Sequence, residues 1–102
     1  MIKVNVLKEE NTIKEIQILG HAMYDDFGKD IVCSAVSSII ITTINGLLAI
    51  DDESILYEEK KDELDIIIKK ENDIVNKLIR NMLDLLKSLH EQYPKNIIVK
   101  GD

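Results

Sequence analysis

The sequence contains a single cysteine, Cys33, and one of its two histidines, His21, lies twelve residues earlier, before a short polar loop. The thiolate is the nucleophilic form of cysteine. A nearby histidine stabilises a thiolate as the imidazolium and then acts as general acid to a leaving group. The two residue types therefore indicate nucleophilic chemistry at a carbonyl, provided that the fold brings them together.

The residues around Cys33 predict how the thiol is positioned. Asp30 is a good N-cap for an apolar helix over residues 31–50, which makes Cys33 its third residue. There the helix dipole favours a thiolate, and the backbone amides can donate to an oxyanion. The Asp30 carboxylate opposes this effect by raising a thiol pKa, so a cationic partner such as His21 is needed. Ser37 follows one turn later on the same helix face.

Each of these residues also has a purely structural interpretation. A lone cysteine in an apolar helix is most often core packing, because cysteine is among the most buried residue types. Asp30 can be an N-cap alone, and Ser37 can be a tolerated helix serine. The residues by themselves leave both the catalytic and the structural interpretation open.

The loop between His21 and Asp30 offers further candidates. Gly20 and Gly28 are most simply turn residues. Tyr24 and Phe27 are apolar residues in a loop, so they are expected either to cover a bound peptide or to anchor the loop.

Composition bounds the function. The 102 residues predict one domain over 1–102, with 45% hydrophobic and 31% charged residues. The net charge of −6 argues against duplex nucleic acid, which requires a basic face, and is compatible with a basic partner. A single cysteine excludes an internal disulfide, and two histidines with one cysteine form no metal-site pattern. No phosphate-binding motif occurs, so no cofactor is expected.

The apolar segment 31–50 is long enough to raise the question of a membrane helix. It contains several serine, threonine and asparagine residues, which favours a buried helix of a soluble protein. No apolar region typical of a signal peptide follows Met1. The sequence therefore predicts a cytoplasmic protein with no membrane association.

Hydrophobic periodicity predicts the elements. Alternation indicates a β-hairpin over residues 2–19, a second hairpin over 54–70 and a short strand over 96–100. Helical spacing predicts a helix over 72–93, capped by Asn72 or Asp73. Its expected apolar side comprises Ile74, Leu78, Met82, Leu85, Leu86 and Leu89. The predicted fold is a small α+β domain, ββαββαβ, with two helices packed on a mixed or antiparallel β-sheet.

The helix predicted over 31–50 is apolar almost all round. Such a helix is buried on more than one side, and one sheet in a domain of this size cannot cover it fully. This pattern favours a homodimer.

The run around these residues resembles the ribosomal-processing cysteine protease family, Prp. The family pattern is Gly-His-Ala, a loop, and then Gly-x-Asp-Ile-Val-Cys followed by small residues and a serine. The matching positions here are Gly20, His21, Ala22, Gly28, Asp30, Ile31, Val32, Cys33 and Ser37. The chain length and the order of elements are also similar to the family along the whole chain.

The resemblance implies a Cys-His peptidase that removes the N-terminal extension of a large-subunit ribosomal protein, cutting after a Phe-Phe pair. It implies a homodimer with helices on a β-sheet. Carried over, Cys33 is the nucleophile and His21 its base and acid, while Gly20, Asp30 and Ser37 support the site. Met23, Tyr24, Phe27 and Gly28 are the candidates for a substrate loop.

Two positions depart from the family pattern. Met23 stands where a small residue is common after His-Ala, and Ser34 stands where alanine is usual after the cysteine. Met23 is expected to stiffen the loop and to alter which side chains the pocket admits. Two other functions remain open: a non-catalytic ribosome-assembly domain that binds a basic ribosomal protein, and a thioesterase that uses the same pair.

Overall fold

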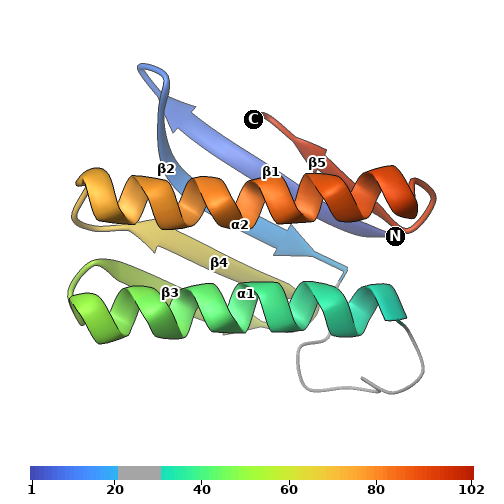
Figure 1. The fold of residues 1–102 in the computed structure, drawn as a ribbon, viewed down its shortest axis with the longest axis horizontal. Helices are drawn as coiled ribbons and strands as arrows, with labels where there is room; N and C mark the ends of the chain where they lie inside the picture. Colours follow the sequence, from blue (N-terminus) through green and yellow to red (C-terminus); the bar gives the residue numbers. More distant parts are fainter. Residues whose placement is uncertain (21–30) are drawn as a thin grey trace.

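The computed structural model describes residues 1–20 and 31–102. Its elements, in chain order, are β1 (Ile2–Glu9), β2 (Thr12–Leu19), α1 (Ile31–Ile50), β3 (Ile55–Lys60), β4 (Glu63–Ile68), α2 (Asp73–Gln92) and β5 (Ile97–Lys100). This confirms the predicted ββαββαβ order (Figure 1).

The five strands form one mixed sheet in the order β3-β4-β2-β1-β5. β1 and β5 are parallel, and the other neighbouring strands are antiparallel. The β1–β2 hairpin closes through Glu10 and Asn11, whose φ angles are +51° and +66°. Two left-handed residues in a two-residue turn match the twist of the flanking strands, so this turn fixes the register of the hairpin.

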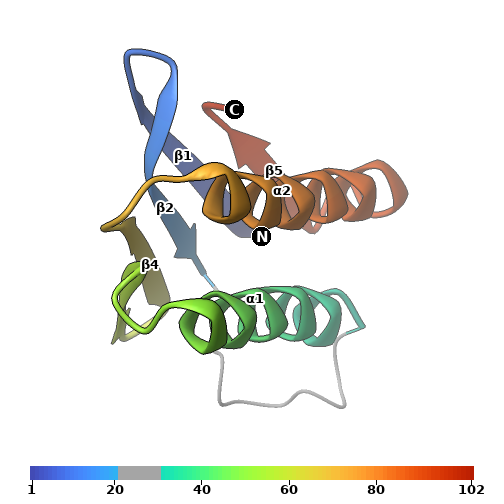
Figure 2. The same ribbon diagram turned by 60° about the vertical axis from the view of Figure 1, so that its left-hand side comes forward.

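Both helices cover the same face of the sheet (Figures 1 and 2). Strand alternation explains why that face is apolar: Val4 lies opposite Ile18, and Ile18 lies opposite Leu64 in the next strand. All three side chains are buried. The intervening residues, such as Gln17, point to the other face, and no helix within 1–20 or 31–102 covers that face.

The core between helices and sheet is built almost entirely from isoleucine, leucine and valine. α2 begins at the N-cap Asn72, whose Oδ1 accepts a hydrogen bond of 3.0 Å from the Val75 amide. This decides between the two predicted caps, Asn72 and Asp73. At its other end, Nδ1 of His90 lies 2.5 Å from the carbonyl oxygen of Ile97 and ties α2 to β5.

The predicted apolar side of α2 was partly wrong. Ile74 and Leu85 are exposed, while Val75, Ile79 and Leu83 are buried. The physical reason is that α2 packs on both the sheet and α1, so its buried stripe is turned relative to the stripe expected from spacing alone.

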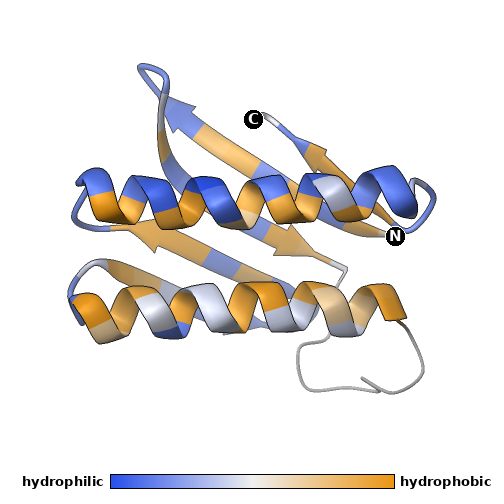
Figure 3. Ribbon diagram, in the orientation of Figure 1, coloured by the Kyte–Doolittle hydropathy of each residue, from blue (hydrophilic) through white to orange (hydrophobic). Residues whose placement is uncertain are grey.

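α1 is apolar on the outside as well as the inside (Figure 3). It is long and apolar enough to cross a membrane, a test that the core helix of a soluble protein also passes. Val36 and Ile40 are fully buried, whereas Ile31, Ile41 and Ile50 are exposed. Within a single chain α1 is thus covered incompletely, as expected for an apolar helix in a domain of this size, and its further burial by a second subunit stays a prediction.

Candidate active site

Cys33 is the third residue of α1, as predicted, and its side chain is half-buried. The first turn of α1 contains no acidic residue, so nothing within the helix offsets the positive end of its dipole. A partly accessible thiol at this place is suited to react as a thiolate, whereas a fully buried cysteine would be inert.

Ser37 lies one turn after Cys33 and is buried, at 3% exposure. The spacing of four residues places both side chains on one face of α1. Val36 and Ile40 beside them are packed in the core, so Cys33 sits where the buried face of the helix reaches the surface. The structure thus brings these two predicted residues together.

A hollow of about 380 Å³ lies along α1. Its lining begins with Ser34, the residue after Cys33, and includes Ser37, Ser38, Ile41 and Thr42. A second hollow, of about 190 Å³, shares Ile41 and is lined by residues of α1, β3 and β4. These are Ile41, Ile44, Asn45, Tyr57, Glu59 and Leu64. The two hollows follow one another along α1 towards strand β3, and Glu59 is the charged residue among those that line them.

Gly20 fixes the point at which the chain leaves the sheet. Its φ is +77°, and a Cβ there would lie 2.7 Å from the carbonyl oxygen of Met1. Its amide donates to the carbonyl oxygen of Asp62 in the β3–β4 turn, at 2.8 Å. Any side chain at this position would be strained, so the backbone favours glycine here, and the predicted role of Gly20 in supporting the site stays a prediction.

Along the longest axis of the molecule, the end of β2 and the beginning of α1 lie toward the same end (Figure 1). The segment that joins them holds the other predicted site residues, which lie outside the described residues: His21, Met23, Tyr24, Phe27, Gly28 and Asp30. Their predicted roles stay predictions. Within the described residues, no group of three or more His, Cys, Asp or Glu residues could hold a metal ion.

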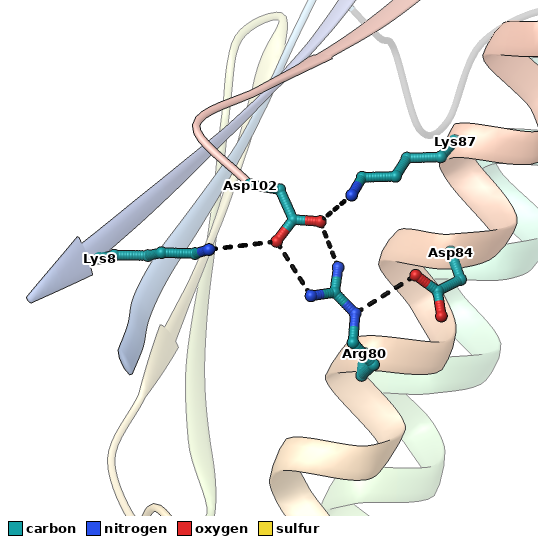
Figure 4. Close-up of polar contacts among 5 residues, drawn as sticks. All are labelled: Lys8, Arg80, Asp84, Lys87 and Asp102. Atoms are coloured by element: carbon teal, nitrogen blue, oxygen red, sulfur yellow. Dashed lines mark hydrogen bonds and ion pairs between the residues drawn. The ribbon is translucent and has the colours of Figure 1, made fainter. Parts of the chain in front are cut away.

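Sequence reasoning missed a cluster of charges around Asp102 (Figure 4). Its carboxylate forms ion pairs with Lys8, Arg80 and Lys87, and its side chain is only 2% exposed. The hydrogen bonds from Arg80 are the main cause that lowers the pKa of Asp102 well below its usual range. Arg80 and Asp102 are 22 residues apart in sequence, so no periodic pattern links them. Spacing alone therefore could not predict this cluster, the Asp102 clamp.

A second missed group lies on the open face of the sheet. The Nζ of Lys60 lies 3.0 Å from Oδ2 of Asp65 and 3.8 Å from Oε2 of Glu63. Alternation of apolar and polar residues in β4 places both carboxylates on one face, but it gave no sign that Asp65 is buried, at 4% exposure.

The family described as "Cysteine protease Prp" matches residues 1–98. A ribosomal processing cysteine protease Prp from Mycoplasma genitalium is 30% identical over 104 residues, covering 100% of this chain and 97% of that protein. A protein with the same description from Staphylococcus aureus is 27% identical, with 95% of each chain covered.

The fold is similar to solved structures as well. The crystal structure of an essential ribosomal processing protease Prp from S. aureus, in complex with a covalently linked product peptide, has a TM-score of 0.84. It is 24% identical, and the match covers 97% of each chain. The α+β fold predicted from the sequence is thereby confirmed. The chain belongs to the Prp family of ribosomal processing cysteine proteases and is a cysteine protease.

Proposed function

We propose that this protease removes the N-terminal extension of a large-subunit ribosomal protein, with Cys33 as the nucleophile and His21 as its base and acid. The observation that carries the proposal is the place of Cys33, half-buried in the first turn of α1, directly before Ser34, which lines an uncharged hollow. Membership of a peptidase family favours this function over a binding module or a thioesterase.

In the proposed reaction, the Cys33 thiolate attacks the carbonyl carbon of the scissile peptide bond. The first-turn amides of α1 stabilise the oxyanion. As the carbon–nitrogen bond breaks, the imidazolium of His21 protonates the leaving amine and a thioester remains on Cys33. Neutral His21 then takes a proton from water, which hydrolyses the thioester and releases the thiol.

The proposed cut follows an aromatic residue. The hollow beside Cys33 and the hollow that shares Ile41 with it supply an apolar surface, to which Tyr57 and Leu64 contribute. Aromatic side chains bury a large area in such a groove. S. aureus Prp has been crystallised with a substrate peptide, which supports a peptide groove in this family.

We further propose that the chain acts as a homodimer in the cytoplasm and binds no nucleic acid directly. Exposed Ile50, at 56%, and exposed Ile31 leave apolar surface on an uncharged helix. Such surface is typical of a protein interface. Light scattering should give the mass of a dimer for the wild type and of a monomer for Ile50→Lys. A monomeric wild type would overturn this part of the proposal.

The main experiment is mass spectrometry of the extended ribosomal protein from the same organism after incubation with the chain. We expect one cut after an aromatic residue with the wild type, and none with Cys33→Ala or His21→Ala. His90→Gln is the matched control, because this histidine lies in the last turn of the other helix. It should cut as the wild type does. Cleavage by Cys33→Ala would rule out the proposed nucleophile.

A further inference from the structure

β3 lies at one edge of the sheet, next to β4, and no strand within 1–20 or 31–102 pairs with its other side. The amide of Lys69 donates to the carbonyl oxygen of Ser54 at 2.9 Å, so these two residues form a hydrogen-bonded pair one step before the β3–β4 register begins. Hydrogen-bonded and non-hydrogen-bonded pairs alternate along an antiparallel ladder. The backbone groups of Leu56 therefore point to β4, whereas those of Tyr57 and Glu59 point away from the sheet.

Tyr57 and Glu59 also line the hollow of about 190 Å³ between α1 and β3. Their side chains point to the helix side of the sheet, because Ile66 and Leu64, which lie opposite them in β4, are core residues. Tyr57 is nevertheless 44% exposed. An extended chain laid along this edge would thus meet outward-pointing backbone groups and, with alternate side chains, the hollow.

This edge lies within reach of a peptide bound at Cys33. Ile41 lines both the hollow between α1 and β3 and the larger hollow, whose lining begins with Ser34, directly after Cys33. Ile41 follows Cys33 by eight residues, which is about 12 Å along the helix axis. An extended peptide spans that distance in about four residues.

The direction of β3 decides which part of the peptide lies along it. α1 leads away from Cys33 and is followed by β3, which ends at the turn that holds Asp62. Asp62 accepts the hydrogen bond from Gly20 after β2, and the end of β2 lies toward the same end of the molecule as the beginning of α1 (Figure 1). β3 therefore runs toward the end that holds Cys33. A segment before the cut also runs toward Cys33, so it lies parallel to β3.

We propose that the edge of β3 binds the substrate segment before the cut as an added parallel strand, through the outward backbone groups of Tyr57 and Glu59. The proposal rests on the proposed function, which seats the aromatic residue before the cut in these same hollows. Addition of a strand to a sheet edge gives affinity through the main chain, while pockets for alternate side chains give specificity. Main-chain pairing would thus set the register of the substrate relative to Cys33.

The test uses the wild type and a series of peptides that share one aromatic cleavage site. In each peptide, one backbone N–H before the cut carries a methyl group, which removes a donor without changing the side chain. We expect KM to rise at least about threefold, the scale of one net hydrogen bond, at alternate positions around the fourth residue before the cut. kcat should stay unchanged, because the contact is present in the ground state as well. Methyl groups at the positions in between should have no effect, since those N–H groups point away from β3.

Two variants of one residue separate the backbone of β3 from its side chain. Glu59→Pro removes an outward N–H and leaves the bonds to β4, a change that edge strands tolerate. It should raise KM for the unmodified peptide about three- to tenfold. Glu59→Ala is the matched control: it removes the side chain but keeps the N–H, and KM should stay within about twofold of the wild type. If Glu59→Pro lowers the urea midpoint, the methylated peptides with the wild type decide the question.

The outcomes separate the two proposals. If the wild type cuts all the methylated peptides alike, the added strand is wrong while the protease function stands. If the wild type cuts no peptide, the proposed function fails, and affinities of the same series for Cys33→Ala, measured by fluorescence anisotropy, test the edge alone. Equal affinities would overturn the added strand in that case too. A dimer that becomes a monomer in Glu59→Pro, together with no effect of methylation, would assign the edge to a second copy of the chain and also overturn the proposal.

Discussion

α1 and α2 are both twenty residues long and cover the same face of the sheet, but they differ in chemistry. α2 has a polar side and an apolar side, and charged residues occur throughout its length (Figure 3). α1 contains no charged residue and exposes isoleucine on its outer side. The chain thus holds one amphipathic helix and one helix that is apolar on both its buried and its exposed sides.

The ends of the two helices differ in the same way. α2 is capped by Asn72 and tied to β5 through His90, and the Asp102 clamp holds its middle. α1 holds the predicted nucleophile in its first turn, and its residues line two hollows, the second of them shared with β3 and β4. The contacts of α2 stabilise the fold, whereas α1 combines a core face with exposed apolar surface, which we propose binds a substrate or a second subunit.

The largest expected effect on the free energy of unfolding tests which side of α2 is packed in the core. Leu86 is fully buried and Leu85 is 45% exposed, although the spacing of residues predicted both in the core. Leu86→Ala should lower the free energy of unfolding by about 2–5 kcal/mol, because it removes core contacts and leaves a cavity. Leu85→Ala, the matched control, should cost less than about 1 kcal/mol. Urea denaturation measures both, and equal losses would contradict the observed register of α2.

The error at Leu85 shows what spacing could not decide. Apolar residues in α2 recur at positions that fit more than one stripe, and sequence alone does not say that the helix meets both a sheet and a second helix. The strands were easier to predict, because alternation in β1, β2 and β4 admits one buried face only. The order of the strands in the sheet depends on long-range packing, which no local pattern specifies.

The second effect compares two glycines. Gly20 has a φ of +77°, and a Cβ would meet the Met1 carbonyl oxygen, whereas a Cβ at Gly46 in α1 would meet nothing within 4 Å. Gly20→Ala should cost about 1–3 kcal/mol, the scale of a strained backbone position. Gly46→Ala should stabilise the chain by about 0.5–1 kcal/mol, since alanine restricts the unfolded chain and favours helix. Thermal unfolding checks both, and a stable Gly20→Ala would contradict the proposed constraint.

Gly20, Cys33 and Ser37 were predicted by a motif that places them beside a turn and a helix start, both local features. The structure confirms where these three residues lie, and their roles in the reaction remain predictions. The burial of Asp65 could not be predicted, because an aspartate in an alternating strand is normally read as solvent-facing. Its burial depends on neighbouring strands that are distant in sequence.

The smallest of the three effects concerns the Asp102 clamp (Figure 4). Asp102→Asn should lower the free energy of unfolding by about 1 kcal/mol, because Arg80 and Lys87 are partly exposed and solvent weakens their attraction. Asp84→Asn is the matched control: it removes an exposed carboxylate 3.3 Å from Nε of the same arginine, and it should cost less than about 0.5 kcal/mol.

The contribution of the Asp102 clamp to the free energy of unfolding should depend on pH. Folding lowers the pKa of Asp102, mainly through the Arg80 hydrogen bonds, so its stabilisation is fully present above the ordinary aspartate pKa of about 3.9. It is lost as the pH falls through the lowered pKa, because the carboxylate must then be protonated. The stability difference between wild type and Asp102→Asn should therefore be largest near neutral pH and shrink in acid. A difference that does not change between pH 7 and strong acid would show that Asp102 acts by packing and not by charge.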